Sequence, residues 1–155
     1  MVDFLSRSER SERMAKIRGK DTCPELTLRR ILHRAGFRYR LHNSKLPGRP
    51  DIVLPRYRSV VFVHGCFWHH HEGCRIATIP KSNTQFWIEK FGKNMVRDAR
   101  VKIELEKLGW RVFIVWECEL SSIDKAFQTG VYLAKKLKDG LPTTARKKRR
   151  EGSRF

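Results

Sequence analysis

His64-Gly-Cys-Phe-Trp-His-His-His-Glu-Gly-Cys74 is the stretch around which this chain is organised, and it follows directly on the apolar run at 59–63. It holds four of the six histidines and two of the four cysteines of the chain, beside two adjacent large aromatics. No packing requirement explains that density. Imidazole and thiolate together are the ligand set of zinc. The stretch therefore predicts a metal-binding loop, to which the rest of the chain brings acids and cations.

The loop supplies Cys66, His71 and Cys74, which are three of the four ligands of a closed zinc site. The fourth must come from elsewhere, and Cys118 is the candidate because it follows the last apolar run of the chain. If that run pairs in parallel with the strand leading into Cys66, both end on the same side of the sheet. We therefore predict a structural Cys3His site whose metal folds the loop. The alternative is that these cysteines are ordinary small hydrophobes.

Three histidines remain if His71 binds zinc, namely His64, His69 and His70. Imidazole titrates near neutral pH, so one or two of them can act as catalytic bases. For His70, simple exposure to solvent is a sufficient explanation.

Two apolar runs at 52–54 and 59–63 flank a turn and predict an antiparallel hairpin, the second run forming a buried central strand. A stiff loop with two prolines at 46–50 delivers Asp51 to the head of the first strand. Asp51 is then expected near Val63 and His64, at the end of the second strand. Stability does not explain an acid at that position.

The remaining periodicity predicts a single α/β domain, as the length of 155 residues also indicates. Helices are expected at 6–18, 22–35, 84–108 and 123–138, and further strands at 37–41 and 110–116. The long helix between two strands makes a parallel βαβ unit with a right-handed crossover. The inward faces of the second and third helices are expected to be formed by Leu28, Ile31, Leu32 and Ala35, and by Val101, Leu105 and Leu108.

The first two helices each leave an alternative open. At 6–18 the only large apolar residues are Met14 and Ile17, so the segment is either a frayed terminus or a basic helix that wedges into a DNA minor groove. In the next helix, Thr22 and Glu25 form a capping-box pattern with Pro24 near the first turn. Glu25 therefore has a complete structural explanation if it stands alone.

The charge is strongly basic, with 34 Lys and Arg against 16 Asp and Glu, a net +18. Solubility needs only about 2 to 8 charges in a small domain. A polyanion partner is indicated, and nucleic acid is favoured over an acidic membrane. The chain has neither an apolar run long enough to span a bilayer nor a signal-peptide pattern in residues 1–20. We therefore expect a cytosolic protein without disulfides.

Four motifs carry a resemblance to a known family. They are LPGRPDIVL at 46–54, VFVHGCFWHHHEGC at 61–74, FWIEKFGKN at 86–94 and LGWRVFIVWECEL at 108–120. In this order the chain resembles the very short patch repair endonucleases of bacteria over about residues 8–120. The resemblance implies a restriction-endonuclease-like fold of the PD-(D/E)xK superfamily: a three-layer α/β core with a central mixed β-sheet flanked by helices, plus a structural zinc site. It also implies a Mg²⁺-dependent nickase that cuts the strand carrying T at T:G mismatches, which arise from deaminated 5-methylcytosine.

The resemblance also assigns roles to residues. Asp51 binds Mg²⁺ together with the Val63 carbonyl, Glu25 and His64 assist through water, and His69 is the general base. The zinc ligands are the four residues named above, Cys66, His71, Cys74 and Cys118. The residues that would enter the duplex are Phe67, Trp68 and Trp87 beside the mismatch, and Met14 from the opposite groove. Phe67 and Trp68 could instead belong to the core.

Two departures from the superfamily and family patterns stand out. The second strand lacks the acid-x-Lys half of the superfamily signature and reads Val61-Phe-Val-His64, although this family itself relies on histidine. Some members carry Thr where Val63 stands, which matters little if only its backbone carbonyl binds metal. Glu72-Gly73 makes the zinc loop one residue longer than in some relatives.

The expected organisation is one endonuclease domain at 1–142, with a DNA-gripping helix in 1–20, and a basic disordered tail at 143–155. We expect a monomer in the bacterial cytoplasm, associated with the nucleoid, with a functional link to a cytosine-5 methyltransferase and to a repair polymerase and ligase. Two other functions remain open: a zinc-stabilised DNA-binding module without catalysis, and an endonuclease of the same fold with another lesion or site preference. Only an enzyme explains Asp51 at a strand end beside His64 and His69.

Overall fold

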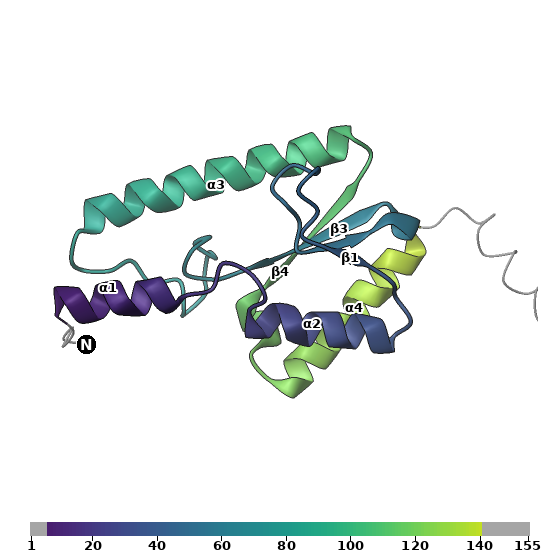
Figure 1. Ribbon diagram of the computed structural model, residues 1–155, viewed down its shortest axis with the longest axis horizontal. Helices are drawn as coiled ribbons and strands as arrows, with labels where there is room; N and C mark the ends of the chain where they lie inside the picture. Colours follow the sequence, from purple (N-terminus) through teal and green to yellow (C-terminus); the bar gives the residue numbers. More distant parts are fainter. Residues whose placement is uncertain (1–5, 141–155) are drawn as a thin grey trace, which may run out of the picture.

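A mixed sheet of four strands in the order β1-β2-β3-β4 forms the centre of the computed structural model, which describes residues 6–140 (Figure 1). The strands are β1 (Arg40–Leu41), β2 (Ile52–Leu54), β3 (Ser59–His64) and β4 (Arg111–Trp116). The helices are α1 (Arg7–Lys16), α2 (Cys23–Arg34), α3 (Thr84–Lys107) and α4 (Ile123–Asp139), with short 3-10 turns η1 (Pro55–Tyr57) and η2 (Glu117–Leu120).

The helices lie on both faces of the sheet, which gives three layers: α3 covers one face, while α2 and α4 cover the other (Figure 1). Alternation along the strands explains this, because successive side chains point to opposite faces. On the α3 face, Val53 and Val60 are fully buried with Leu105. The larger core on the other face contains Leu28, Leu32, Phe37, Ile52, Leu54, Val61, Val115, Leu120, Ala126, Leu133, Ala134 and Leu137. This confirms the predicted sheet flanked by helices.

The predicted hairpin is confirmed. Strands β2 and β3 are antiparallel, with Leu54 opposite Ser59 and Ile52 opposite Val61. The tight connection through η1 ends at Arg58, which takes a left-handed conformation at φ 47°. This register places Asp51, just before β2, beside Val63 near the end of β3.

The predicted parallel unit is also confirmed, since β3 and β4 run in parallel with His64 opposite Trp116. The crossover between them is the single 24-residue helix α3, which ends where Gly109 takes φ 81°. Parallel strands finish at the same edge of a sheet. The loop at 65–83 and η2 therefore start from neighbouring positions, as the placement of Cys118 required.

Several sequence predictions about local structure were wrong. Ala35 is exposed, because α2 ends at Arg34 and the chain turns through Gly36, and Leu108 is 53% exposed just beyond α3. Only Arg40–Leu41 of the predicted strand at 37–41 pairs with β2.

The α1 helix is present as predicted, and its N-terminus has a full capping box between Ser6 and Glu9. None of its residues is buried; Met14 is 41% and Ile17 50% exposed. Among the described residues no helix is both long and apolar enough to cross a membrane. The tail predicted at 143–155 lies outside the described residues.

Candidate metal centre and active site

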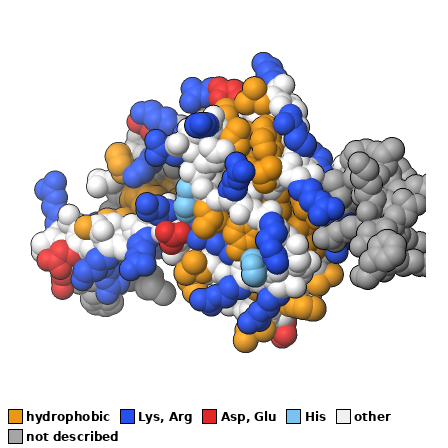
Figure 2. Space-filling model, turned by 45° about the vertical axis from the view of Figure 1, so that its right-hand side comes forward, with side chains coloured by type: hydrophobic (Ala, Val, Ile, Leu, Met, Phe, Trp, Pro, Cys, Tyr) orange, Lys and Arg blue, Asp and Glu red, His pale blue; other side chains and the backbone are white. Residues whose placement is uncertain are grey.

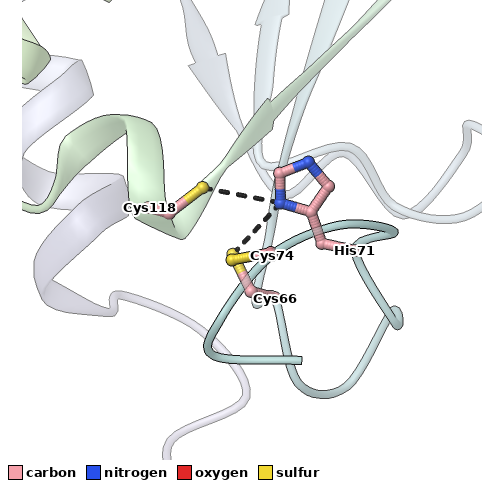
Figure 3. Close-up of side chains that lie close together, drawn as sticks. All are labelled: Cys66, His71, Cys74 and Cys118. Atoms are coloured by element: carbon pink, nitrogen blue, oxygen red, sulfur yellow. Dashed lines mark hydrogen bonds between the residues drawn. The ribbon is translucent and has the colours of Figure 1, made fainter. Parts of the chain in front are cut away.

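Cys66, His71, Cys74 and Cys118 come together where β3 and β4 end (Figure 3). Their ligand atoms lie within 4.8 Å of one another, and His71 Nδ1 is 3.6 Å from Cys66 Sγ and 3.5 Å from Cys118 Sγ. Sulfur and nitrogen ligands at about 2.3 and 2.0 Å from one tetrahedral ion lie about 3.5 Å apart. The four predicted ligands thus lie close enough together to hold one metal ion, and the two His71–Cys distances match a tetrahedral site.

The surroundings hold these ligands in place. The His71 ring stacks on Trp116 with centroids 4.1 Å apart, and the Cys66 amide donates to Glu117 Oε2 at 3.1 Å. Burial raises the pKa of the Cys66 thiol to about 12, while a backbone amide of Ile76 lowers the pKa of Cys74. A metal bound here must therefore displace a tightly held proton from Cys66.

Asp51 lies where the hairpin register predicted. Its Oδ2 accepts the Val63 amide at 2.7 Å, which leaves Oδ1 as the oxygen that can face a cation. Burial raises the pKa of Asp51 to about 6; the Val63 amide opposes that rise, and the charge of Glu25 adds to it. A cation beside Oδ1 would relieve the cost of this half-buried carboxylate.

His64 and His69 stack face to face, with ring centroids 3.8 Å apart and planes at 9°. His69 Nδ1 lies 2.5 Å from Asp98 Oδ2 on α3. An ionised carboxylate only accepts, so Nδ1 carries the proton and Nε2 is the free, basic nitrogen. Burial, and then the charge of His69, lower the pKa of His64 to about 4. His64 is therefore neutral at physiological pH and His69 has the oriented ring of a base.

Glu25 is buried at the first turn of α2, but the reciprocal capping box predicted with Thr22 does not form. The Thr22 hydroxyl instead donates to Glu25 Oε1 at 2.9 Å, and Oε2 accepts from the Asp21 amide at 2.9 Å and from Arg29 at 2.8 Å. The structural explanation of Glu25 is therefore incomplete: it cannot account for a buried arginine beside the acid.

One open cavity of about 1270 Å³ brings all four predicted catalytic residues together. Its walls include Glu25, Asp51, Val63, His64, His69, Trp68 and Asp98. Residues 17–20, between α1 and α2, contribute to the same wall, whereas Met14 itself is not among the lining residues.

The predicted intercalating residues Phe67, Trp68 and Trp87 form one aromatic cluster with Phe91, and all three are only partly buried. Asn94 donates to the Trp68 carbonyl at 2.8 Å and so fixes the loop to α3. The rings of the cluster pack against one another and remain partly exposed to solvent. Its members are therefore neither fully buried core residues nor side chains without contacts.

His70 is not the solvent-exposed residue that the sequence suggested. Its ring is half-buried and stacks on Phe91 with centroids 5.3 Å apart. The clustering of aromatics in the loop explains the error, because a histidine beside them becomes part of their packing.

Comparisons with known proteins fit this geometry. Residues 2–75 match the family model described as DNA mismatch endonuclease Vsr. The chain is 51% identical over 122 residues to the type II nicking enzyme V.NmeAIP of Neisseria meningitidis, an alignment that covers 79% of this chain and 86% of the relative. It is 46% identical over 125 residues to the DNA mismatch endonuclease Vsr of Escherichia coli, covering 81% and 80% respectively.

The chain belongs to the Vsr family of DNA mismatch endonucleases. This confirms the resemblance drawn from the four motifs. A further relative, the type II nicking enzyme V.XorIIP of Xanthomonas oryzae, is 50% identical over 123 residues, which are 79% of this chain and 90% of the relative.

Sequence reasoning missed two residues beside the cavity of this Vsr family member. Asp98 holds His69, and Arg29 holds Glu25. A signal for Asp98 was present, since it stands seven residues before Leu105 on the apolar face of α3, where an acid is out of place. Arg29 gave a similar signal beside Leu28 and Leu32 on the buried face of α2.

Proposed function

We propose that this protein is a Mg²⁺-dependent endonuclease that nicks the strand carrying T at T:G mismatches in double-stranded DNA. One observation carries the proposal: a half-buried acid, Asp51, and an oriented base, His69, line the same cavity, and Trp68 of the aromatic cluster forms part of its wall. A zinc-stabilised module that only binds DNA would need the aromatics and the basic charge. It would have no use for the three histidines and four acids that line this cavity.

Asp51 is the residue that we assign to Mg²⁺. Hard divalent cations take carboxylate and carbonyl oxygens, and Asp51 Oδ1 with the Val63 carbonyl would provide them. When bound, Mg²⁺ polarises the scissile phosphate and lowers the pKa of a water ligand. Without the cation, the Asp51 carboxylate would repel the phosphate in the same cavity.

His69 Nε2 is the atom that accepts the proton of the attacking water in this proposal. Its free lone pair follows from the Asp98 contact at Nδ1, which fixes tautomer and ring orientation together. The neutral His64 ring stacked against it restricts rotation of His69. Glu25 and His64 would orient further water molecules from the cavity wall.

Zinc is the metal that we assign to Cys66, His71, Cys74 and Cys118. Three thiolates and one imidazole are soft and borderline ligands, which suit zinc over Mg²⁺. Because all four positions are taken by protein, no place is left for a substrate or water. The site would therefore stabilise the loop without taking part in catalysis.

DNA recognition would combine charge with stacking. Lys and Arg side chains are spread over the face shown in Figure 2, with few acidic groups among them, and phosphate contacts of this kind carry sequence-independent affinity. Phe67, Trp68 and Trp87 offer partly exposed rings on which a base beside a mismatch can stack. Met14, 41% exposed on α1, would enter the duplex from the opposite groove.

The test compares T:G and matched duplexes with varied flanks, with and without Mg²⁺, on denaturing gels. Wild type is expected to nick only the T strand of T:G duplexes, and only with Mg²⁺. His69→Ala should lower the nicking rate by about 10²- to 10⁴-fold with unchanged metal content. His70→Ala is the matched control and should retain most of the rate. Wild type that binds DNA but nicks no duplex would favour the non-catalytic module, and cleavage of other mismatches alone would favour a different lesion preference.

A further inference from the structure

Arg29 on α2 is the buried centre of a charge network at the wall of the cavity. Its Nη1 lies 2.6 Å from Asp21 Oδ1, and its Nη2 lies 2.8 Å from Glu25 Oε2 and 3.0 Å from His42 Nε2. The Arg29 side chain is 7% exposed and that of Glu25 is 4% exposed. One guanidinium therefore ties the start of α2 to the loop that follows β1.

The contribution of this network to the stability of the fold does not explain its presence. Burying a paired charge is often no better for stability than burying apolar groups of the same size. Arg29 Nε is buried without a hydrogen-bond partner among the described residues, and an orphaned buried donor has a cost. Asp21 and His42 both hold positive φ angles, at 56° and 46°. Costs of this kind gather at functional sites.

The network fixes the position of the Glu25 carboxylate. A carboxylate has about four acceptor sites. Thr22, the Asp21 amide and Arg29 occupy three of them, two of these on Oε2. The remaining site is on Oε1, and Glu25 lines the cavity while Arg29 does not. The network thus fixes the carboxylate and leaves it about one acceptor site for a water molecule.

We propose that Arg29 is a positioning residue for the nicking reaction: it acts as a built-in cation that holds the Glu25 carboxylate at the cavity wall in the one orientation that can bind water. This rests on the proposed catalytic role of Glu25. In its absence, Asp21 and Glu25 would repel each other, and Glu25 would turn away from the cavity. A misplacement of about 1 Å can lower a rate on the order of 10²-fold.

The test is a double-mutant cycle in full-length protein, with single-turnover nicking of a T:G duplex followed over a range of Mg²⁺ concentrations. The variants are Arg29→Met, Arg29→Lys, Glu25→Gln and the Arg29→Met/Glu25→Gln pair, each assayed well below its own melting temperature. Arg30→Met is the matched control, because Arg30 is an exposed arginine on the same helix. A cycle isolates coupling between the two side chains from their separate effects on the fold.

Arg29→Met is expected to lower the nicking rate by about 10- to 100-fold, with Arg29→Lys in between and Arg30→Met close to wild type. In the Glu25→Gln background, Arg29→Met should lower the rate less than about twofold further. Equal losses in both backgrounds would overturn the proposal and reduce Arg29 to a support of the fold. If Arg29→Met does not fold, the same comparison is made with Arg29→Lys. Glu25→Gln at the wild-type rate would instead overturn the role of Glu25 in the proposed function.

Discussion

Asp51 is held in a state that costs the fold free energy. Burial raises its pKa from an ordinary value near 3.8 to about 6. A group with a raised folded pKa contributes stability below its unfolded pKa, and that contribution is lost as pH rises through the folded pKa. For Asp51 the loss falls between about pH 4 and pH 6, so the ionised form at neutral pH destabilises the protein unless a cation is bound.

Asp51→Asn is therefore expected to stabilise the protein at pH 7.5 without added divalent metal. Asparagine can still accept the Val63 amide, but it carries no charge to desolvate. The gain should be on the order of 1 to 3 kcal/mol in the free energy of unfolding and should vanish near pH 4. Urea unfolding at several pH values measures it, with the exposed Glu12→Gln as control. Equal stability of wild type and Asp51→Asn at pH 7.5 would contradict the burial argument.

Asp98 is the residue on which the orientation of His69 depends. Asp98→Asn keeps the size of the side chain, but its amide can donate as well as accept, so the His69 tautomer is no longer fixed. We expect the nicking rate to fall by at least about 10²-fold, approaching the loss for His69→Ala. Metal content and melting temperature should stay near wild type. An Asp98→Asn protein that nicks normally would show that His69 needs no partner.

At the scale of elements, the loop at 65–83 stands out because it contains neither helix nor strand. Three of its side chains, Cys66, His71 and Cys74, converge with Cys118 of η2, and its few turns are closed by contacts such as Cys74 N to His71 O at 3.1 Å. A segment of this kind has little to hold it but the proposed metal. Its order and the order of the aromatic cluster should therefore depend on the fourth ligand, Cys118.

Cys118→Ala should lower both the zinc content, from about one per chain, and the melting temperature. Cys23→Ala is the matched control, because Cys23 is the exposed cysteine outside the cluster. Metal analysis and thermal unfolding, run on the same samples, provide the two readings. Full zinc content with unchanged melting in Cys118→Ala would remove this residue from the site.

The α1 helix should serve binding and not stability, since none of its residues is buried. Deleting residues 1–16 is expected to change the melting temperature by less than about 2 °C and to weaken duplex binding by at least about tenfold, because several cations are lost. Arg13→Gln/Lys16→Gln, which removes charge but keeps Met14, is the comparison. A large drop in melting temperature on deletion would show that α1 is part of the folded core.

Sequence patterns predicted the elements that follow one another along the chain and pack directly against each other. The β2–β3 hairpin and the β3–α3–β4 unit followed from alternation, turn residues and the handedness of crossovers, and they in turn placed Asp51 beside Val63 and Cys118 beside Cys66. The short strand β1 could not be bounded in this way. Whether residues 37–39 pair depends on where the antiparallel strand β2 ends, not on their own alternation.

What could not be predicted were contacts between distant elements. His69 meets Asp98 across 29 residues, and Arg29 meets His42 from another loop, so only the packing of α3 and α2 on the sheet creates these pairs. Leu108 fits the apolar periodicity of α3 but falls after the helix has passed the sheet, and it is exposed. Local pattern thus indicated which residues could be functional, while tertiary packing decided which of them are coupled.

Over the whole molecule, charge is divided unevenly between cavity and surface. The chain has only 16 acids against 34 Lys and Arg, yet four of those acids line one cavity, namely Glu25, Asp51, Asp98 and Glu117. Such an arrangement attracts a polyanion overall while keeping a local place for a divalent cation where the phosphate must react. We therefore expect that sequence-independent affinity for DNA and the rate of nicking depend on different residues, so that mutations can change one without the other.

Salt dependence tests this separation. A protein with 6 to 10 phosphate contacts loses about 10³- to 10⁵-fold in affinity between 50 and 200 mM salt. We expect a comparably steep fall for wild type on T:G and matched duplexes alike. Deleting residues 143–155 removes six Lys and Arg and one Glu, so it should flatten the salt dependence and weaken binding to both duplexes by the same factor.

Trp68→Ala should do the reverse: the salt dependence of binding stays the same, and the preference for T:G falls by an amount equivalent to about 1 to 3 kcal/mol of stacking. Fluorescence anisotropy titrations at four salt concentrations give both quantities. If the tail deletion changed the preference for T:G, or if Trp68→Ala changed the salt slope alone, charge and recognition would not be divided between the surface and the aromatic cluster in this way.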